Sequence, residues 1–351
     1  MDNIMIYGIC ALFGCFFALT FLLSRLKTDV FPENYEFQLD PFWYVWGMMG
    51  IGSIAVYCLF PPLADMVHRY TFWQLILPLI FAGGIYMTYL FDIDWLSNLL
   101  TLAAAVTISF LQPDDYALLP QKLSLWQERL VVALVLFAIS KGLGLLNGLG
   151  GIAAMQFCAV MIAAVCLAYF GALPRFFAVL ALAYLGTMVA FAFFSWPPEK
   201  IVMSHGGFSA IGFVLACFML AAANEFAESS MLIACSYLFT EIGVAFYNHF
   251  LLRDKTEQLF MSTSYYTTSE QGKFELGVAR GVLKILALDV LLACAQISAS
   301  DRFALLFFAV IVNLWFLSIL AGKTKPEELF SLTKMGKNAV KKIFKKKKDN
   351  L

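Results

Sequence analysis

The chain has 351 residues, of which 61% are hydrophobic and 14% are charged, and its 24 basic and 24 acidic residues leave no net charge. In soluble domains about half of the residues are apolar and about a quarter are charged, so this composition excludes an ordinary soluble protein. We predict an all-α integral membrane protein, and we expect no nucleic-acid partner.

Apolar stretches that reach or approach the roughly 20 residues needed to cross a bilayer recur along the chain. We predict about eleven transmembrane helices, at Ile4 to Leu23, Phe42 to Phe60, Phe72 to Phe91, Leu96 to Leu111, Leu130 to Leu146, Ile152 to Phe170, Phe176 to Phe194, Phe208 to Ala223, Met231 to Leu252, Val282 to Ile297 and Phe303 to Leu320. They would form one polytopic domain, residues 1–322, followed by a tail, residues 323–351.

The tail is strongly basic and sets the predicted orientation. It contains ten lysines: Lys323, Lys325, Lys334, Lys337, Lys341, Lys342, Lys345, Lys346, Lys347 and Lys348. Because clustered basic residues stay cytoplasmic, the C-terminus is predicted inside and, with eleven spans, the N-terminus outside. Apolar residues at helical spacing further predict an amphipathic helix that binds anionic lipid of the inner leaflet; alternatively, the tail only fixes the topology.

This orientation gathers five polar segments on the cytoplasmic face: residues 25–41, 92–94, 147–151, 195–207 and 253–281. No loop is long enough to form a sizeable soluble domain, so any chemistry would belong to these segments. The fourth is a polar, glycine-rich break between two apolar spans. Gly206 and Gly207 would let backbone N–H groups approach an anion closely, although an ordinary short loop is the alternative.

Part of this break resembles a signature of the polyprenyl-phosphate N-acetylhexosamine-1-phosphate transferases. This family includes the phospho-N-acetylmuramoyl-pentapeptide transferase of peptidoglycan synthesis and the UDP-N-acetylglucosamine-1-phosphate transferases. Its signature, Pro-Ala-Lys-x-Phe-Met-Gly-Asp-x-Gly-Ser, is similar to the run Pro198-Glu199-Lys200-Ile201-Val202-Met203-Ser204-His205-Gly206-Gly207. His205 stands in place of the family's aspartate.

Three further segments resemble the family in order and spacing, each with changed residues. Asp92 and Asp94 follow the third span, where the family has two adjacent aspartates. Asn147 and Gly150 replace the aspartates of the family's Asn-x-x-Asp-Gly-Leu-Asp-Gly-Leu-Ala. After the ninth span, a sequence that includes Tyr266 and Thr267 replaces the family's histidine cluster.

The resemblance implies an enzyme that transfers a sugar phosphate from a UDP-sugar to polyprenyl phosphate with Mg²⁺. By resemblance, Asp92 and Asp94 would be the catalytic and metal-binding residues. The substrate-binding residues would be Asn147, Lys200, His205, Gly206, Gly207, Tyr266 and Thr267. Imidazole is a poor ligand for Mg²⁺, and neutral groups replace several charged ones, so we expect a catalytically degenerate homologue.

Such a homologue would bind polyprenyl phosphate or a partner enzyme of cell-envelope glycan synthesis in a bacterial inner membrane, and a homodimer is compatible with this expectation. Three alternatives stay open. The protein is an active Mg²⁺-dependent transferase, or His205 joins Asp92 and Asp94 around a softer metal, or the protein is a lipid carrier or flippase.

Ionisable residues inside apolar spans carry a cost that usually has a functional reason. Asp289 lies well inside the tenth predicted span, and we expect it to face the bundle and to pair, with a lysine as one candidate partner. Lys141 and Glu241 lie nearer to span ends, where extension of the side chain to the interface is an equal alternative.

Overall fold

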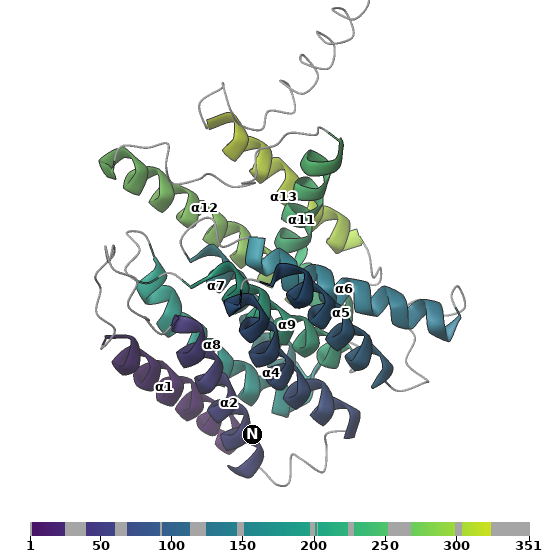
Figure 1. Cartoon of the computed structure of the whole chain (residues 1–351). Helices are drawn as coiled ribbons and strands as arrows, with labels where there is room; N and C mark the ends of the chain where they lie inside the picture. Colours follow the sequence, from purple (N-terminus) through teal and green to yellow (C-terminus); the bar gives the residue numbers. More distant parts are fainter. Residues whose placement is uncertain are drawn as a thin grey trace, which may run out of the picture.

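The computed structural model describes residues 2–24, 40–59, 69–91, 93–112, 124–145, 151–196, 201, 203–223, 228–251, 268–298 and 304–323. Every regular element among them is helical (Figure 1). The α-helices are α1 (Asp2–Ser24), α2 (Pro41–Leu59), α4 (Arg69–Leu90), α5 (Asp94–Phe110), α6 (Leu125–Leu145), α7 (Ile152–Tyr169), α8 (Arg175–Ser195), α9 (His205–Ala222), α10 (Glu228–Ala234), α11 (Ser236–Leu251), α12 (Thr268–Ala295) and α13 (Ala304–Lys323), and the 3-10 turn η4 (Gln296–Ser298) follows α12.

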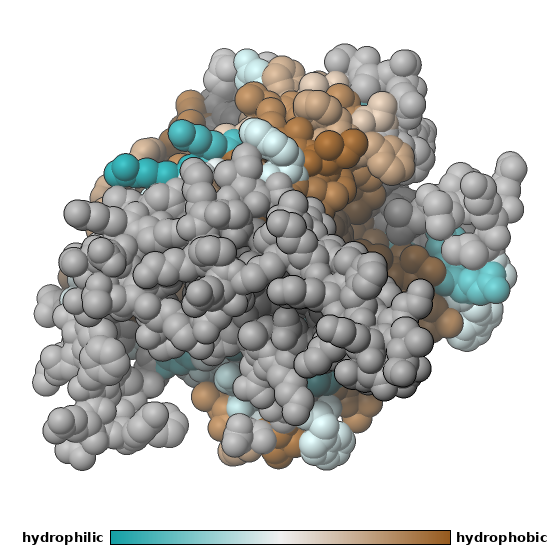
Figure 2. All heavy atoms as spheres, turned by 90° about the horizontal axis from the view of Figure 1, so that it is seen from above, coloured by the Kyte–Doolittle hydropathy of each residue, from teal (hydrophilic) through white to brown (hydrophobic). Residues whose placement is uncertain are grey.

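The helices have the length and surface of a membrane protein. Four segments are long and apolar enough to cross a bilayer: Ile6–Ser24, Ile152–Tyr169, Arg175–Ser195 and His205–Ala222. Large apolar side chains point outward, among them Phe17, Phe193 and Phe307, each more than 60% exposed. Much of the surface that Figure 2 shows in colour is hydrophobic. Lipid is the solvent that such a surface suits.

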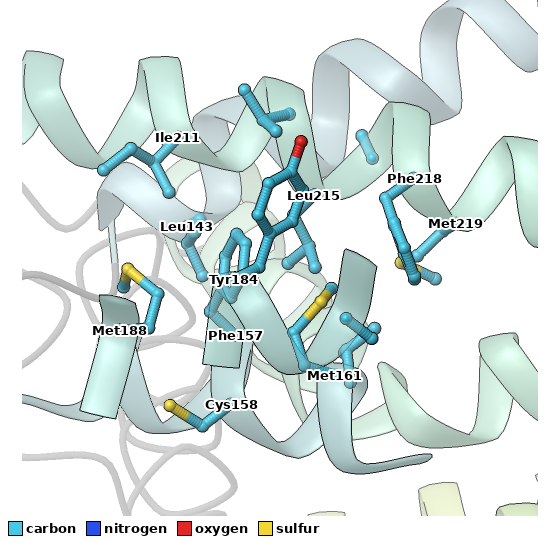
Figure 3. Packing of buried hydrophobic residues seen from close by; sticks show 14 of the residues in the cluster. Leu143, Phe157, Cys158, Met161, Tyr184, Met188, Ile211, Leu215, Phe218 and Met219 are labelled. Carbon is cyan, nitrogen blue, oxygen red and sulfur yellow. The ribbon is translucent and has the colours of Figure 1, made fainter. Parts of the chain in front are cut away.

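The centre of the bundle consists of α7, α8 and α9, most of whose side chains are buried. Figure 3 shows side chains from these helices and Leu143 of α6 packed together. The ring of Tyr184 lies 6.4 Å from that of Phe157 and 6.3 Å from that of Phe218. The Tyr184 hydroxyl shares a hydrogen bond of 2.8 Å with the Ser53 hydroxyl, which satisfies this buried polar group.

Glycines allow the closest helix contacts, as in other helical membrane proteins. A Cβ atom at Gly186 of α8 would overlap the carbonyl oxygen of Leu12 in α1, and one at Gly8 of α1 would meet Leu182 and Val179. Gly8 of α1 thus lies beside residues 179 and 182 of α8, and the later residue Leu12 lies beside the later residue Gly186. Because the contacts follow the same order in both helices, α1 and α8 run parallel.

Several helix ends meet at one end of the bundle. Gly144, near the end of α6, contacts His205 at the start of α9, and Gly206 of α9 contacts Tyr89 near the end of α4. Gly207 contacts Phe42 at the start of α2. This grouping gathers segments that precede or follow the predicted polar loops, and it contains the candidate site.

The predicted spans correspond to the helices with three differences. The predicted break at residues 195–207 ends earlier, because His205, Gly206 and Gly207 already belong to α9. The ninth predicted span is interrupted at Cys235, between α10 and α11. α12 begins at Thr268, inside the predicted loop 253–281. Its first turns are polar, and a search for apolar stretches does not detect a polar helix.

Candidate anion site at the start of α9

Ser204 starts α9 as its capping residue. Its backbone is extended, and its side-chain oxygen accepts a hydrogen bond from the Gly207 N–H at 3.1 Å. The first N–H groups of a helix have no acceptor within the helix, and together they carry a partial positive charge. The start of α9 is therefore suited to an anion, on the condition that other groups complete the site.

His205 is the exposed residue of this first turn. Its Nδ1 lies 2.8 Å from the carbonyl oxygen of Gly144. Because a carbonyl only accepts hydrogen bonds, Nδ1 carries a proton, and the lone pair of the neutral ring is on Nε2. A Cβ atom at Gly144 would lie 3.0 Å from the imidazole, so a glycine at this position lets the ring bind the end of α6.

Gly206 and Gly207 are buried and serve contacts between helices. A Cβ atom at Gly206 would fall inside the ring of Tyr89, and one at Gly207 would lie 2.7 Å from Met203 Cγ and 3.3 Å from Phe42 Cβ. The glycines thus allow α4 and α2 to approach α9. We predicted that a ligand could approach these two glycines closely, but side chains already occupy the space beside them.

The Tyr86 hydroxyl is an unsatisfied polar group beside Ser204. It lies within hydrogen-bonding reach of the Asp40 and Ser204 side chains, is completely buried, and makes no hydrogen bond of good geometry to a described residue. The Tyr86 ring stacks on Phe42 with 4.0 Å between the centroids. Burial of an unpaired hydroxyl costs about 1–3 kcal/mol, which favours a ligand that bonds to it.

Asp40 fixes the start of α2 next to this hydroxyl. Its Oδ1 accepts a hydrogen bond of 2.9 Å from the Phe42 N–H, as expected of an aspartate that precedes a helix with proline in its first position. We did not predict Asp40 or Tyr86 as site residues. The Asp-Pro pair before an apolar span was a signal for the helix start, whereas nothing local marks Tyr86.

The structure locates only some of the predicted site residues. His205, Gly206 and Gly207 lie at the start of α9, and Asp94 is the first residue of α5. The other predicted site residues lie outside the described part of the chain: Asp92, Asn147, Lys200, Tyr266 and Thr267. The predicted amphipathic helix of the tail lies outside it as well. The Asp94 side chain is also outside it.

The side chains of Asp92 and Asp94, the predicted magnesium ligands, lie outside the described residues, and the groups described at this end of the bundle do not form a magnesium site by themselves. Among the described residues no group of three His, Cys, Asp or Glu side chains could hold a metal ion. His205 offers an imidazole, and Asp40 uses Oδ1 to cap α2. Hard Mg²⁺ favours several oxygen ligands in octahedral geometry, which these groups do not supply.

Comparison of the sequence with models of known protein families and with curated proteins gives no match.

Proposed function

We propose that this membrane protein is a catalytically degenerate relative of the polyprenyl-phosphate sugar-phosphate transferases and binds the phosphate of a polyprenyl phosphate at the start of α9. The observation that supports this proposal is the buried, unsatisfied Tyr86 hydroxyl beside Ser204, the residue that caps α9. A helix start and the Tyr86 hydroxyl together offer hydrogen bonds to one anion, and the partial positive charge of the helix start works against the negative charge of the neighbouring Asp40.

The ligand would be held by groups of different kinds. Tyr86 would donate a hydrogen bond to a phosphate oxygen, and His205 would add positive charge when it is protonated on both nitrogens. Exposed apolar side chains at the end of α4, Met87, Leu90 and Phe91, supply a surface for an isoprenoid chain beside the same site. The polar head and apolar chain of the ligand would both find suitable contacts.

In this proposal the protein has about eleven spans in a bacterial inner membrane, and the start of α9 faces the cytoplasm. The contact between Gly144 and His205 and the one between Tyr89 and Gly206 agree with helices that alternate in direction. The sequence changes at the family's motifs, such as His205 and Asn147 in place of aspartates, are the reason to propose lipid binding without sugar transfer.

Native mass spectrometry of the full-length protein in lipid nanodiscs tests the proposal. Undecaprenyl phosphate should bind more tightly than undecaprenol, which lacks the phosphate. Tyr86→Phe removes only the hydroxyl and should weaken phosphate-lipid binding about 10- to 100-fold, the range for a hydrogen bond to a charged group. Tyr184→Phe is the matched control, since the Tyr184 hydroxyl bonds to Ser53 in the core.

Equal affinity for the phosphate and the alcohol would refute the proposed site. A transfer assay with UDP-N-acetylglucosamine, undecaprenyl phosphate and Mg²⁺ tests the degenerate character separately. A product that disappears in Asp92→Asn and Asp94→Asn would show an active transferase in place of a binding protein.

A further inference from the structure

The interruption between α10 and α11 lies among buried polar groups from three other helices. α10 ends at Ala234 and α11 begins at Ser236, so the break falls within the ninth predicted membrane span. Cys235 itself stays bonded as in a helix, since its N–H donates to the Met231 carbonyl and its carbonyl accepts from the Phe239 N–H, both at 3.1 Å. Other backbone groups beside the break need other partners in an apolar environment. The Gln156 side chain of α7 supplies one, because its Nε2 donates a hydrogen bond of 3.1 Å to the Ala234 carbonyl.

α12 and α13 place Asp289 and Asn313 against Ser236 and Tyr237, the residues that follow the break. Asp289 lies within hydrogen-bonding reach of the Ser236 hydroxyl and the Tyr237 N–H. Asn313 Nδ2 donates to Ser236 Oγ at 2.9 Å and lies 3.2 Å from Asp289 Oδ2. We call Gln156, Ser236, Asp289 and Asn313 the break cluster; each is at most 1% exposed.

Among the described residues, the Asp289 carboxylate of the break cluster has no positive partner. The polar groups around Asp289 are Asn313, Ser236 and the Tyr237 N–H, all of them neutral. The lysine that we considered as a partner is not found among the described residues, and Asn313 takes its place. An ionised carboxylate in an apolar interior is costly unless a cation neutralises it.

Two amide oxygens of the break cluster are also unsatisfied. Gln156 Oε1 and Asn313 Oδ1 are buried, and neither has a hydrogen-bond partner among the described residues. Gln156 contacts the break at Ala234, and Asn313 contacts it at Ser236. One carboxylate and two amide side chains therefore flank the same short segment. Both amide oxygens lack a donor among the described residues.

We propose that the break cluster binds one monovalent cation of the sodium type. Carboxylate, amide and hydroxyl oxygens are ligands for hard cations, whereas softer transition metals favour imidazole and thiolate. One carboxylate balances one positive charge, and a divalent ion would leave excess charge in the apolar interior. Rotation of the Asn313 amide would turn its oxygen toward Asp289. The argument does not depend on the site at α9.

Thermal unfolding of the full-length protein in nanodiscs, followed by tryptophan fluorescence, tests the proposal. Sodium chloride replaces choline chloride stepwise at constant ionic strength and pH. The midpoint should rise with the logarithm of the sodium concentration, since a ligand that binds only the folded state stabilises it. Asp289→Asn should abolish this dependence. Glu241→Gln should keep it, because this matched change affects another buried carboxyl group, outside the break cluster.

If Asp289→Asn does not fold, Asn313→Leu and Ser236→Ala keep the proposal testable. Each should raise the sodium concentration at which the midpoint begins to rise about tenfold or more, the usual cost of disturbing a metal site. A wild-type midpoint that is the same in sodium and choline would overturn the proposal. So would a midpoint that follows pH alone, which would indicate a proton, or a sodium response that persists in Asp289→Asn.

Discussion

Replacing Gly186 with alanine should destabilise the protein by about 2 kcal/mol. The new Cβ atom would overlap the Leu12 carbonyl oxygen and lie 2.9 Å from its carbon and 3.0 Å from Leu12 Cα. These are backbone atoms, so no rotamer change relieves the overlap and α1 must move away from α8. Overpacking of this kind costs up to about 3 kcal/mol, and the better helix propensity of alanine returns about 1 kcal/mol.

The difference corresponds to a change of roughly thirtyfold in the unfolding equilibrium. Reversible unfolding in mixed micelles, with an increasing mole fraction of dodecyl sulfate, measures it. Gly14→Ala in α1 is the control, since among the described residues no atom of another helix lies within 4 Å of the new Cβ atom there; it should leave the stability unchanged or raise it. If Gly186→Ala were as stable as Gly14→Ala, the reasoning from close α1–α8 contact would be wrong.

Three further substitutions test other contacts. Gly206→Ala should displace the Tyr89 ring, lower the unfolding midpoint and weaken undecaprenyl phosphate binding in native mass spectrometry; unchanged binding would show that Tyr89 does not shape the site. Ser204→Ala should lower the free energy of unfolding by about 1 kcal/mol in the micelle titration. Ser204→Asn should recover most of this loss, because asparagine caps a helix start as well as serine does. Arg129→Lys should cost about 1.5–3 kcal/mol, since lysine cannot reproduce the two contacts of the buried guanidinium, 2.6 Å to Gln112 Oε1 and 3.0 Å to the Gln112 carbonyl; full stability would contradict their importance.

Hydropathy predicted the helical class and the approximate position of most helices, because apolar stretches in a membrane protein coincide with its helices. It did not predict the break at Cys235. The local sequence around this residue contains neither proline nor glycine, and the groups that satisfy the break belong to α7, α12 and α13. The number of spans and the sidedness of the protein stay predictions.

The candidate site was predictable only in part. The sequence indicated that the start of α9 was important, but it could not distinguish a glycine that admits a ligand from one that admits a side chain, as Gly206 admits Tyr89. Tyr86 was missed because its significance depends on Ser204, which is distant in sequence and close in space. Asp289 was expected to pair, but its partner Asn313 is an ordinary polar residue in an apolar span.

The parallel contact between α1 and α8 has a consequence for the order of events during translation. All helices from α2 to α7 are synthesised between these two neighbours. Helices of membrane proteins insert first and associate afterwards, so α1 must wait in the bilayer with Gly8 facing lipid until α8 emerges. A nascent chain that stops before Arg175 leaves its first helix without its principal neighbour, and chaperones and membrane proteases would encounter it in this form.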